Sequence, residues 1–124
     1  EGIIKAIIKS KRNYEKNISY QMFISLLSCA DVMVGNSSSG IIEAPYFNLP
    51  VVNIGTRQNG RQRAKNVIDC DYNTKQIKQA IELALSTEFD VQSPYDHGST
   101  YQKVLDFLNK IEINEKLLQK TLTY

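Results

Sequence analysis

The chain has 124 residues, of which 42% are hydrophobic and 23% charged, and its formal net charge at pH 7 is +2. This length and composition predict one globular domain with enough apolar material for a core. So small a charge makes neither nucleic acid nor an anionic membrane surface an expected partner, and no apolar run approaches the roughly 20 residues that cross a bilayer. Cys29 and Cys70 lack metal-ligand spacing, so we expect free thiols and no metal. Free thiols are typical of a reducing compartment, so we expect a cytoplasmic protein. We also expect no cofactor.

The first half of the chain is predicted to alternate helices and strands. Isoleucines at helical spacing predict an amphipathic helix over residues 2–10, and residues 14–18 are expected to form a short strand. Ser19 is a suitable N-cap for a helix whose apolar side chains would share one face: Met22, Phe23, Leu26 and Leu27. A strand over 32–34 follows. The next helix, about 40–47, contains Pro45 and must therefore be short or kinked.

The second half continues the alternation. Residues 51–54 form a β-branched run that we expect to be buried on both faces, 55–65 an ordered loop, and 66–70 another strand. Thr74 is predicted to cap a helix whose buried face carries Ile77, Ala80, Ile81, Ala84 and Leu85. A further helix would carry Val104, Leu105, Leu108 and Ile111, and the tail over 114–124 is expected to be helical.

This alternation predicts an α/β fold, a Rossmann-like parallel sheet with helices on both faces. The chain lacks an initiating Met and opens within an apolar segment, so we expect a fragment whose earlier elements are missing. Ligands of such sheets bind beyond the carboxyl ends of the strands.

Two polar segments follow successive predicted strands and should therefore meet at one edge of the sheet. The first, Asn36-Ser37-Ser38-Ser39-Gly40, offers backbone N–H groups and three hydroxyls where a helix begins, as anion sites do. Such residues are also ordinary N-cap and turn formers. The second is the loop that contains Arg57, Arg61 and Arg63. Glu43, one helical turn beyond the serines, places a carboxylate near this anion seat, which suits a nucleoside diphosphate.

These segments closely resemble the hydrolysing UDP-N-acetylglucosamine 2-epimerases. The resemblance runs from about residue 18 to 111, through Asn36 to Pro45, Leu49 to Gln58, Gly60-Arg61 and Asn66 to Ile68. It implies that residues 1–124 are part of the C-terminal, UDP-binding lobe of a two-lobed, glycosyltransferase-B-like fold. Members convert UDP-GlcNAc and water to ManNAc and UDP, the entry step to sialic acid, and are commonly homodimers.

The resemblance also implies roles for particular residues. Ser37 and Ser38, with the backbone of Ser39 and Gly40, would hold the diphosphate of UDP. Glu43 would accept hydrogen bonds from the ribose, and Arg57 and Arg61 would face the phosphate or sugar. Phe23 matches an aromatic position beside uracil, and the Ile18 backbone matches the segment that reads the base edge. The catalytic acid and base of the family lie upstream of Glu1.

Each role has a simpler alternative. Phe23 could serve the core alone, the arginines could form only surface ion pairs, and Glu43 could be a solvated helix carboxylate. Relatives carry Tyr-Gly-Asp-Gly where this chain has Tyr95-Asp96-His97-Gly98, and a loop histidine is more typical of capping or solvent exposure than of a general base.

Three other functions stay open: an epimerase of a UDP-bacillosamine-type sugar, the C-terminal lobe of a glycosyltransferase, and a non-catalytic nucleotide-binding domain. Gly55-Thr56-Arg57-Gln58 with Gly60-Arg61 argues against the glycosyltransferase. Because the proton chemistry is expected upstream, the isolated chain should bind UDP weakly and turn nothing over.

Overall fold

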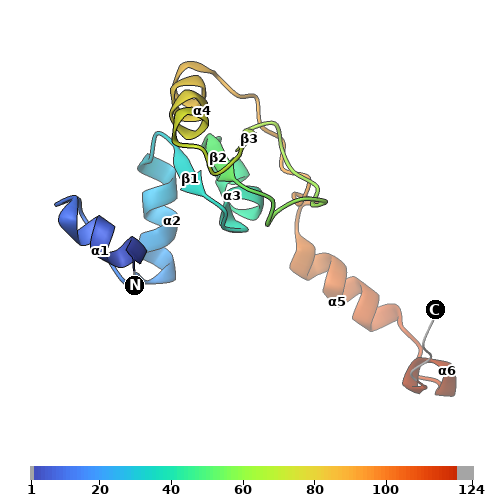
Figure 1. Cartoon of the computed structure of the whole chain (residues 1–124). Coiled ribbons are helices and arrows are strands. Elements are labelled where there is room, and N and C mark those ends of the chain that lie inside the picture. The colour runs from blue at the N-terminus through green and yellow to red at the C-terminus, as the bar shows by residue number, and fades with distance from the viewer. Residues whose placement is uncertain (1, 120–124) are drawn as a thin grey trace. The chain divides into compact units, whose positions relative to one another are not determined.

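The computed structural model describes residues 2–119, so the predicted tail beyond Gln119 lies outside the described part. The contacts divide the chain into two units, Glu1–Pro94 and Tyr95–Tyr124. In chain order, the first unit contains α1 (Gly2–Lys9), α2 (Tyr20–Cys29), β1 (Met33–Gly35), α3 (Ser39–Ile42), the 3₁₀ helix η1 (Ala44–Phe47), β2 (Val51–Ile54), β3 (Val67–Cys70) and α4 (Thr74–Ser86) (Figure 1). The second contains α5 (Thr100–Lys110) and α6 (Glu115–Leu118).

The three strands form one parallel sheet in the order β1-β2-β3, which confirms the predicted fold class. Met33 pairs with Val51, and Val51 pairs in turn with Val67. The chain passes from β2 to β3 through the loop over residues 55–66, which contains no helix, as predicted. The carboxyl ends of β1 and β2 therefore lie side by side, and the serine turn and the arginine loop leave the sheet at the same edge.

Helices cover both faces of this sheet because neighbouring side chains of a strand point to opposite sides. On one face, α2 and η1 pack around the buried residues Leu27, Ala44, Leu49 and Val51, with Met33 and Val67 against them. On the other face, α4 places Ala80 and Ala84 against Val52, with Ile54 and Ile68 packed around them. Both faces of β2 are thus buried, which confirms that prediction and makes the arrangement Rossmann-like.

Pro45 divides the predicted helix over 40–47 into two short pieces. α3 ends at Ile42, and the 3₁₀ helix η1 begins at Ala44 with Pro45 in its first turn, where a missing N–H costs no hydrogen bond. Asn48 then adopts φ 50°, and its N–H donates to the carbonyls of Ala44 and Pro45. Of the two predicted alternatives, a short helix or a kinked one, the short helix is therefore correct.

Four local predictions for the first unit were wrong. Residues 14–18 form no strand, since no ladder partner lies beside them in the described part of the chain. Met22 and Leu26 are 54% and 48% exposed, because α2 packs through Phe23, Ile24 and Leu27 instead. The cap of α4 is Asn73, whose side chain accepts from the N–H groups of Lys75 and Gln76, and not Thr74.

The fourth wrong prediction placed Leu85 on the buried face of α4, whereas its side chain is 57% exposed. Ala80 and Ala84 bring α4 so close to the sheet that its buried face is narrow, and Leu85 lies about 100° around the helix from Ala84. The N-cap prediction for α2 is confirmed, since the Ser19 hydroxyl accepts from the N–H of Met22 at 3.2 Å.

In the second unit, α5 ends at Lys110, and Ile111 is its C-cap rather than part of the helix. None of the described side chains of α5 is buried. The predicted tail helix is confirmed only for Glu115–Leu118, with Asn114 as its N-cap. No helix within residues 2–119 is both long and apolar enough to span a membrane.

Candidate functional site

The serine turn joins β1 to α3 and holds several hydrogen-bonding groups that the protein leaves unused. The N–H of Gly40 donates to the Ser37 carbonyl at 3.2 Å, and the N–H of Ser39 contacts the Ser37 hydroxyl at 3.3 Å. Within the described residues, the N–H groups of Ser37 and Ser38 have no acceptor, and the Ser38 hydroxyl makes no cap hydrogen bond. Two amides and a hydroxyl are therefore available to an anion.

Gly40 contributes to this turn mainly by being small. A Cβ placed on it would lie 2.7 Å from Val51 Cγ1 and 3.8 Å from Met33 Sδ. Gly40 is buried, so α3 is held directly against the sheet at the point where the serines emerge. The N–H of Gly40 already donates within the turn. Its predicted backbone contact with the diphosphate stays a prediction.

Glu43 lies at the junction of α3 and η1 and lines a hollow of about 460 Å³. The other lining residues are mostly apolar or aromatic: Tyr20, Ile24, Ile42, Tyr46 and Phe47. One carboxylate oxygen, Glu43 Oε2, is buried and has no hydrogen-bond partner in the part of the chain described. Folding alone does not explain a buried carboxylate oxygen without a donor, because such groups are costly.

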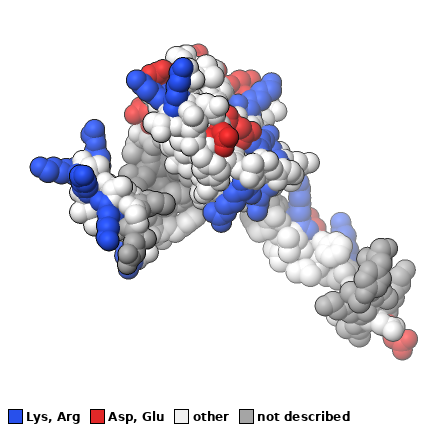
Figure 2. Space-filling view, viewed as in Figure 1, with Lys and Arg blue, Asp and Glu red and all other residues white. Residues whose placement is uncertain are grey.

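The arginine loop contacts the serine turn, which confirms that both lie at the same edge of the sheet. The Gln58 side chain is 3% exposed, and its Nε2 donates to the Asn36 carbonyl at 2.7 Å. In Figure 2, basic side chains gather at the edge of the sheet beside the loop between β2 and β3. The two segments singled out in the sequence are thus joined by a direct hydrogen bond.

The three arginines of this loop differ in their contacts. Arg63 binds both carboxylate oxygens of Asp69, at 2.6 and 2.8 Å, and also donates to the Gln58 carbonyl at 2.7 Å. Arg57 and Arg61 are exposed and form no ion pair with any described residue. Two of the three positive charges are therefore free to meet an anion, while the third stabilises the loop.

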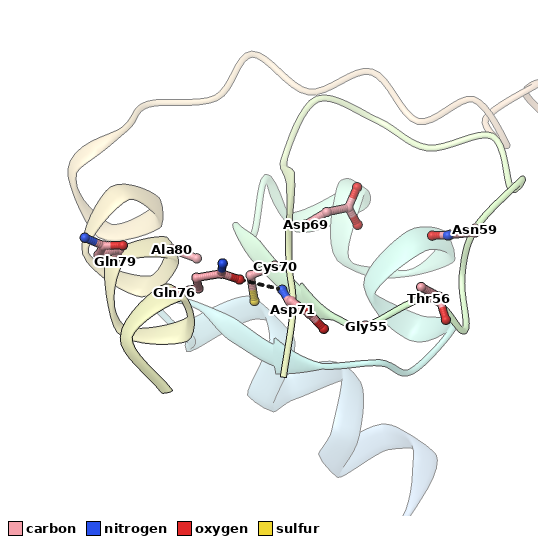
Figure 3. Close-up of a pocket in the computed structure, with 9 residues that line it drawn as sticks. All are labelled: Gly55, Thr56, Asn59, Asp69, Cys70, Asp71, Gln76, Gln79 and Ala80. Carbon is pink, nitrogen blue, oxygen red and sulfur yellow. Dashed lines mark hydrogen bonds between the residues drawn. The ribbon is translucent and has the colours of Figure 1, made fainter. Parts of the chain in front are cut away.

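A second hollow, of about 570 Å³, opens where β2 and β3 end beside α4 (Figure 3). Its lining residues are largely polar: Gly55, Thr56, Asn59, Asp69, Cys70, Asp71, Gln76, Gln79 and Ala80. Burial, together with the negative charges of Asp69 and Asp71, raises the pKa of the Cys70 thiol, so this sulfur is a poor nucleophile at neutral pH. No cluster of three or more His, Cys, Asp or Glu side chains that could hold a metal occurs within residues 2–119.

The predicted base-reading residues lie at the start of α2 and just before it. Phe23 is half-buried and packs against the core of the sheet, and its contact with uracil stays a prediction. Ile18 is 40% exposed in the segment that precedes the Ser19 cap. Tyr20, which sequence reasoning missed, is 68% exposed and shares the hollow of Glu43. Its position four residues before Ile24 on one helix face was the available signal.

The chain is an α/β protein whose Rossmann-like sheet brings a turn with unused donors, a neighbouring carboxylate and exposed arginines to its carboxyl edge, where sheets of this class bind their ligands. The sequence profile described as "UDP-N-acetylglucosamine 2-epimerase" matches residues 2–109. The chain therefore belongs to the UDP-N-acetylglucosamine 2-epimerase family, and the resemblance seen in the sequence is confirmed.

Three curated relatives extend this finding. The chain is 41% identical over 110 residues to a hydrolysing UDP-N,N'-diacetylbacillosamine 2-epimerase of Legionella pneumophila, covering 88% of this chain and 29% of the relative. It is 42% identical over 85 residues to a UDP-N-acetylglucosamine 2-epimerase of Neisseria meningitidis, covering 68% and 22%. It is 48% identical over 73 residues to a GDP/UDP-N,N'-diacetylbacillosamine 2-epimerase of Campylobacter jejuni, covering 59% and 18%. The chain thus spans less than a third of each relative.

Proposed function

We propose that this chain is the UDP-binding part of a hydrolysing UDP-N-acetylglucosamine 2-epimerase, which converts UDP-GlcNAc and water to ManNAc and UDP. The observation that supports the proposal most is the hydrogen bond between Gln58 and Asn36, which brings the serine turn and the arginine loop together. Family membership supplies the reaction class. In this proposal, residues 1–124 form part of the C-terminal lobe of a glycosyltransferase-B-like fold.

The diphosphate would lie against the serine turn. The unused N–H groups of Ser37 and Ser38 and the Ser38 hydroxyl would donate to its oxygens, with the backbone of Ser39 and Gly40 around them. Arg57 and Arg61, which carry unpaired charge on the neighbouring loop, would balance the charge of the phosphates. These contacts strengthen as the diphosphate departs, so they favour the transition state for loss of UDP.

The nucleoside would lie toward Glu43 and the start of α2. The ribose hydroxyls would donate to the Glu43 carboxylate, which explains why one of its oxygens is buried without a partner. Uracil would lie near Phe23 and the backbone of Ile18. The mainly apolar hollow beside Glu43 is lined by Tyr20 and Ile24 of α2 and by neither Phe23 nor Ile18, so it supports only a nucleoside near the start of α2.

The reaction is best written as an elimination followed by a hydration. A base removes the C2 proton of the sugar, the C1–O bond breaks with its electron pair on the departing UDP, and a C1–C2 double bond forms. Water then adds at C1, and C2 receives a proton on the opposite face. The proposed site would stabilise the leaving group, and we propose that the acid and base belong to parts of the full-length relatives that this chain does not cover.

A second candidate is the 2-epimerisation of a UDP-diacetylbacillosamine-type sugar. Two of the three relatives described above carry that activity in their names. A fourth curated relative, 29% identical over 103 residues, is the polysialic acid biosynthesis protein P7 of Escherichia coli, which supports a sialic acid pathway for the first candidate. The proposed contacts all involve UDP and none distinguishes one sugar from the other.

For the whole protein, we propose a homodimer in the cytoplasm. The family resemblance supports the dimer. The two free cysteines, Cys29 and Cys70, support a reducing compartment. Size-exclusion chromatography with light scattering on the complete gene product would test the dimer, and a monomer at micromolar concentration would contradict it.

The activity is tested by comparing the complete gene product with the 124-residue chain. We expect the complete product to release UDP and ManNAc from UDP-GlcNAc, or the corresponding sugar from UDP-diacetylbacillosamine. The chain alone should bind UDP and release neither sugar. Turnover by the chain at a rate near that of a curated relative, or no UDP release from either substrate by the complete product, would contradict the proposal.

A further inference from the structure

The side chain of Gln58, in the arginine loop, reaches back to the serine turn by a hydrogen bond. The side chain is 3% exposed, and its Nε2 donates to the Asn36 carbonyl at 2.7 Å. A carbonyl can only accept, so the contact fixes which end of the Gln58 amide faces the turn. The other end, Oε1, is buried and accepts no hydrogen bond from the described residues. The buried Gln58 amide therefore makes one recorded side-chain hydrogen bond, the one to Asn36.

The main chain of Gln58 is held as firmly as its side chain. Its carbonyl accepts from Arg63 Nη2 at 2.7 Å, while Arg63 Nη1 binds both oxygens of Asp69. Asp69 also accepts from Asn53 Nδ2 at 2.7 Å, which anchors the pair to β2. The loop is therefore tied to the sheet through Arg63 and to the serine turn through Gln58.

This arrangement divides the loop into fixed and free residues. Gln58 and Arg63 are engaged within the protein, whereas Arg57 and Arg61, on either side of Gln58, are exposed and carry unpaired charge. A cation attracts an anion strongly only when it is held close to it, because the interaction falls with distance and is screened in water within about 10 Å. The position of Gln58 thus controls how near both free arginines stay to the turn.

We propose that Gln58 is a positioning residue that holds the arginine loop against the serine turn, so that Arg57 and Arg61 bind the diphosphate seated there. The proposal rests on the proposed function, because it takes UDP as the ligand. Its specific consequence is that losing the Gln58 contact weakens binding of the diphosphate and leaves binding of the nucleoside unchanged.

The test compares the wild-type chain with Gln58→Met, which keeps the length and volume of the side chain but cannot donate to Asn36. Gln79→Met, an exposed residue of α4, is the matched control. The first readout needs no ligand: trypsin cleaves after arginine, so cleavage at Arg57 and Arg61 reports how firmly the loop is held. We expect Gln58→Met to be cut at these two sites at least fivefold faster than wild type and control.

The second readout is the ratio of the dissociation constants for uridine and UDP, measured by titration calorimetry. We expect Gln58→Met to reduce the preference for UDP about tenfold with little change for uridine. A loosened loop with an unchanged ratio would show that Gln58 is merely structural, and an unchanged cleavage rate would show that it does not hold the loop. Either result overturns the inference. A wild-type chain that prefers UDP no more than uridine would instead overturn the proposed diphosphate site itself.

Asp69→Asn serves as a second variant where Gln58→Met does not fold. Asp69 lies 57% exposed, so the substitution is expected to be tolerated, and it removes the charge that fixes Arg63. We expect the same direction in both readouts with a smaller change. Faster cleavage with an unaltered ratio in this variant would likewise overturn the inference, because the position of the loop would then not matter to the diphosphate.

Discussion

Replacing Glu43 by Gln separates a role in ligand binding from a role in folding. Glu43 Oε2 is buried without a partner in the described chain, so the substitution breaks no hydrogen bond made by that oxygen in the free protein. It also removes a charge from a partly buried position. We therefore expect the melting temperature of the free chain to stay the same or rise slightly.

Binding should respond in the opposite direction. A hydrogen bond to a charged acceptor contributes about 1.5–3 kcal/mol, and losing one such bond to the ribose raises the dissociation constant for UDP about 10- to 150-fold. The measurement is titration calorimetry with UDP and with 2′,3′-dideoxy-UDP, which lacks both ribose hydroxyls. Wild type should bind the dideoxy ligand more weakly than UDP, whereas Glu43→Gln should discriminate less between the two.

The matched control is Glu82→Gln. Glu82 lies on α4 and forms an exposed ion pair with Lys78 at 3.9 Å, so its loss should leave both affinities unchanged. Our reasoning would be refuted by a Glu43→Gln chain that keeps the full wild-type preference for UDP over the dideoxy ligand. That result would mean that the carboxylate does not meet the ribose.

Three further predictions concern stability and reactivity. Gly40→Ala places a Cβ 2.7 Å from the stiff side chain of Val51, so the free energy of unfolding in urea should fall by about 1–3 kcal/mol; an unchanged midpoint would contradict the tight packing. Asn73→Ala removes the cap of α4 and should cost about 1 kcal/mol by the same assay, whereas Thr74→Ala should cost less. Because its pKa is raised, Cys70 should form its reactive thiolate only at higher pH, so at pH 8 iodoacetamide should modify it more slowly than exposed Cys29; equal rates would contradict this.

The sequence predicted the sheet well because its strands are short, mainly apolar segments followed by polar segments, and β2 is a β-branched run. β2 is buried on both faces, and such a run has few alternatives in an α/β chain. The predicted strand over 14–18 failed because local β-propensity cannot supply a neighbouring strand to pair with. The exposure of Leu85 was missed for a related reason, since helical spacing does not indicate how wide the buried face will be.

The candidate site was likewise predicted only in part from the sequence. The serines, Glu43 and the arginine cluster were visible as residue types in a suggestive order. Nothing in the sequence distinguished Arg63, which binds Asp69, from Arg57 and Arg61, which stay free. The buried role of Gln58 depends on a contact with Asn36, 22 positions earlier in the chain, and no local pattern predicts such a contact.

The most direct test of the account is an amide NMR titration of the 124-residue chain with UDP. The account predicts saturable shifts that are largest at the N–H groups of Ser37 and Ser38, which lack acceptors in the free chain, with further shifts at Arg57 and Glu43. Uridine should leave the two serine amides nearly unchanged. An absence of saturable shifts, or shifts confined to the hollow beside α4 in Figure 3, would contradict the claim that the serine turn holds the diphosphate.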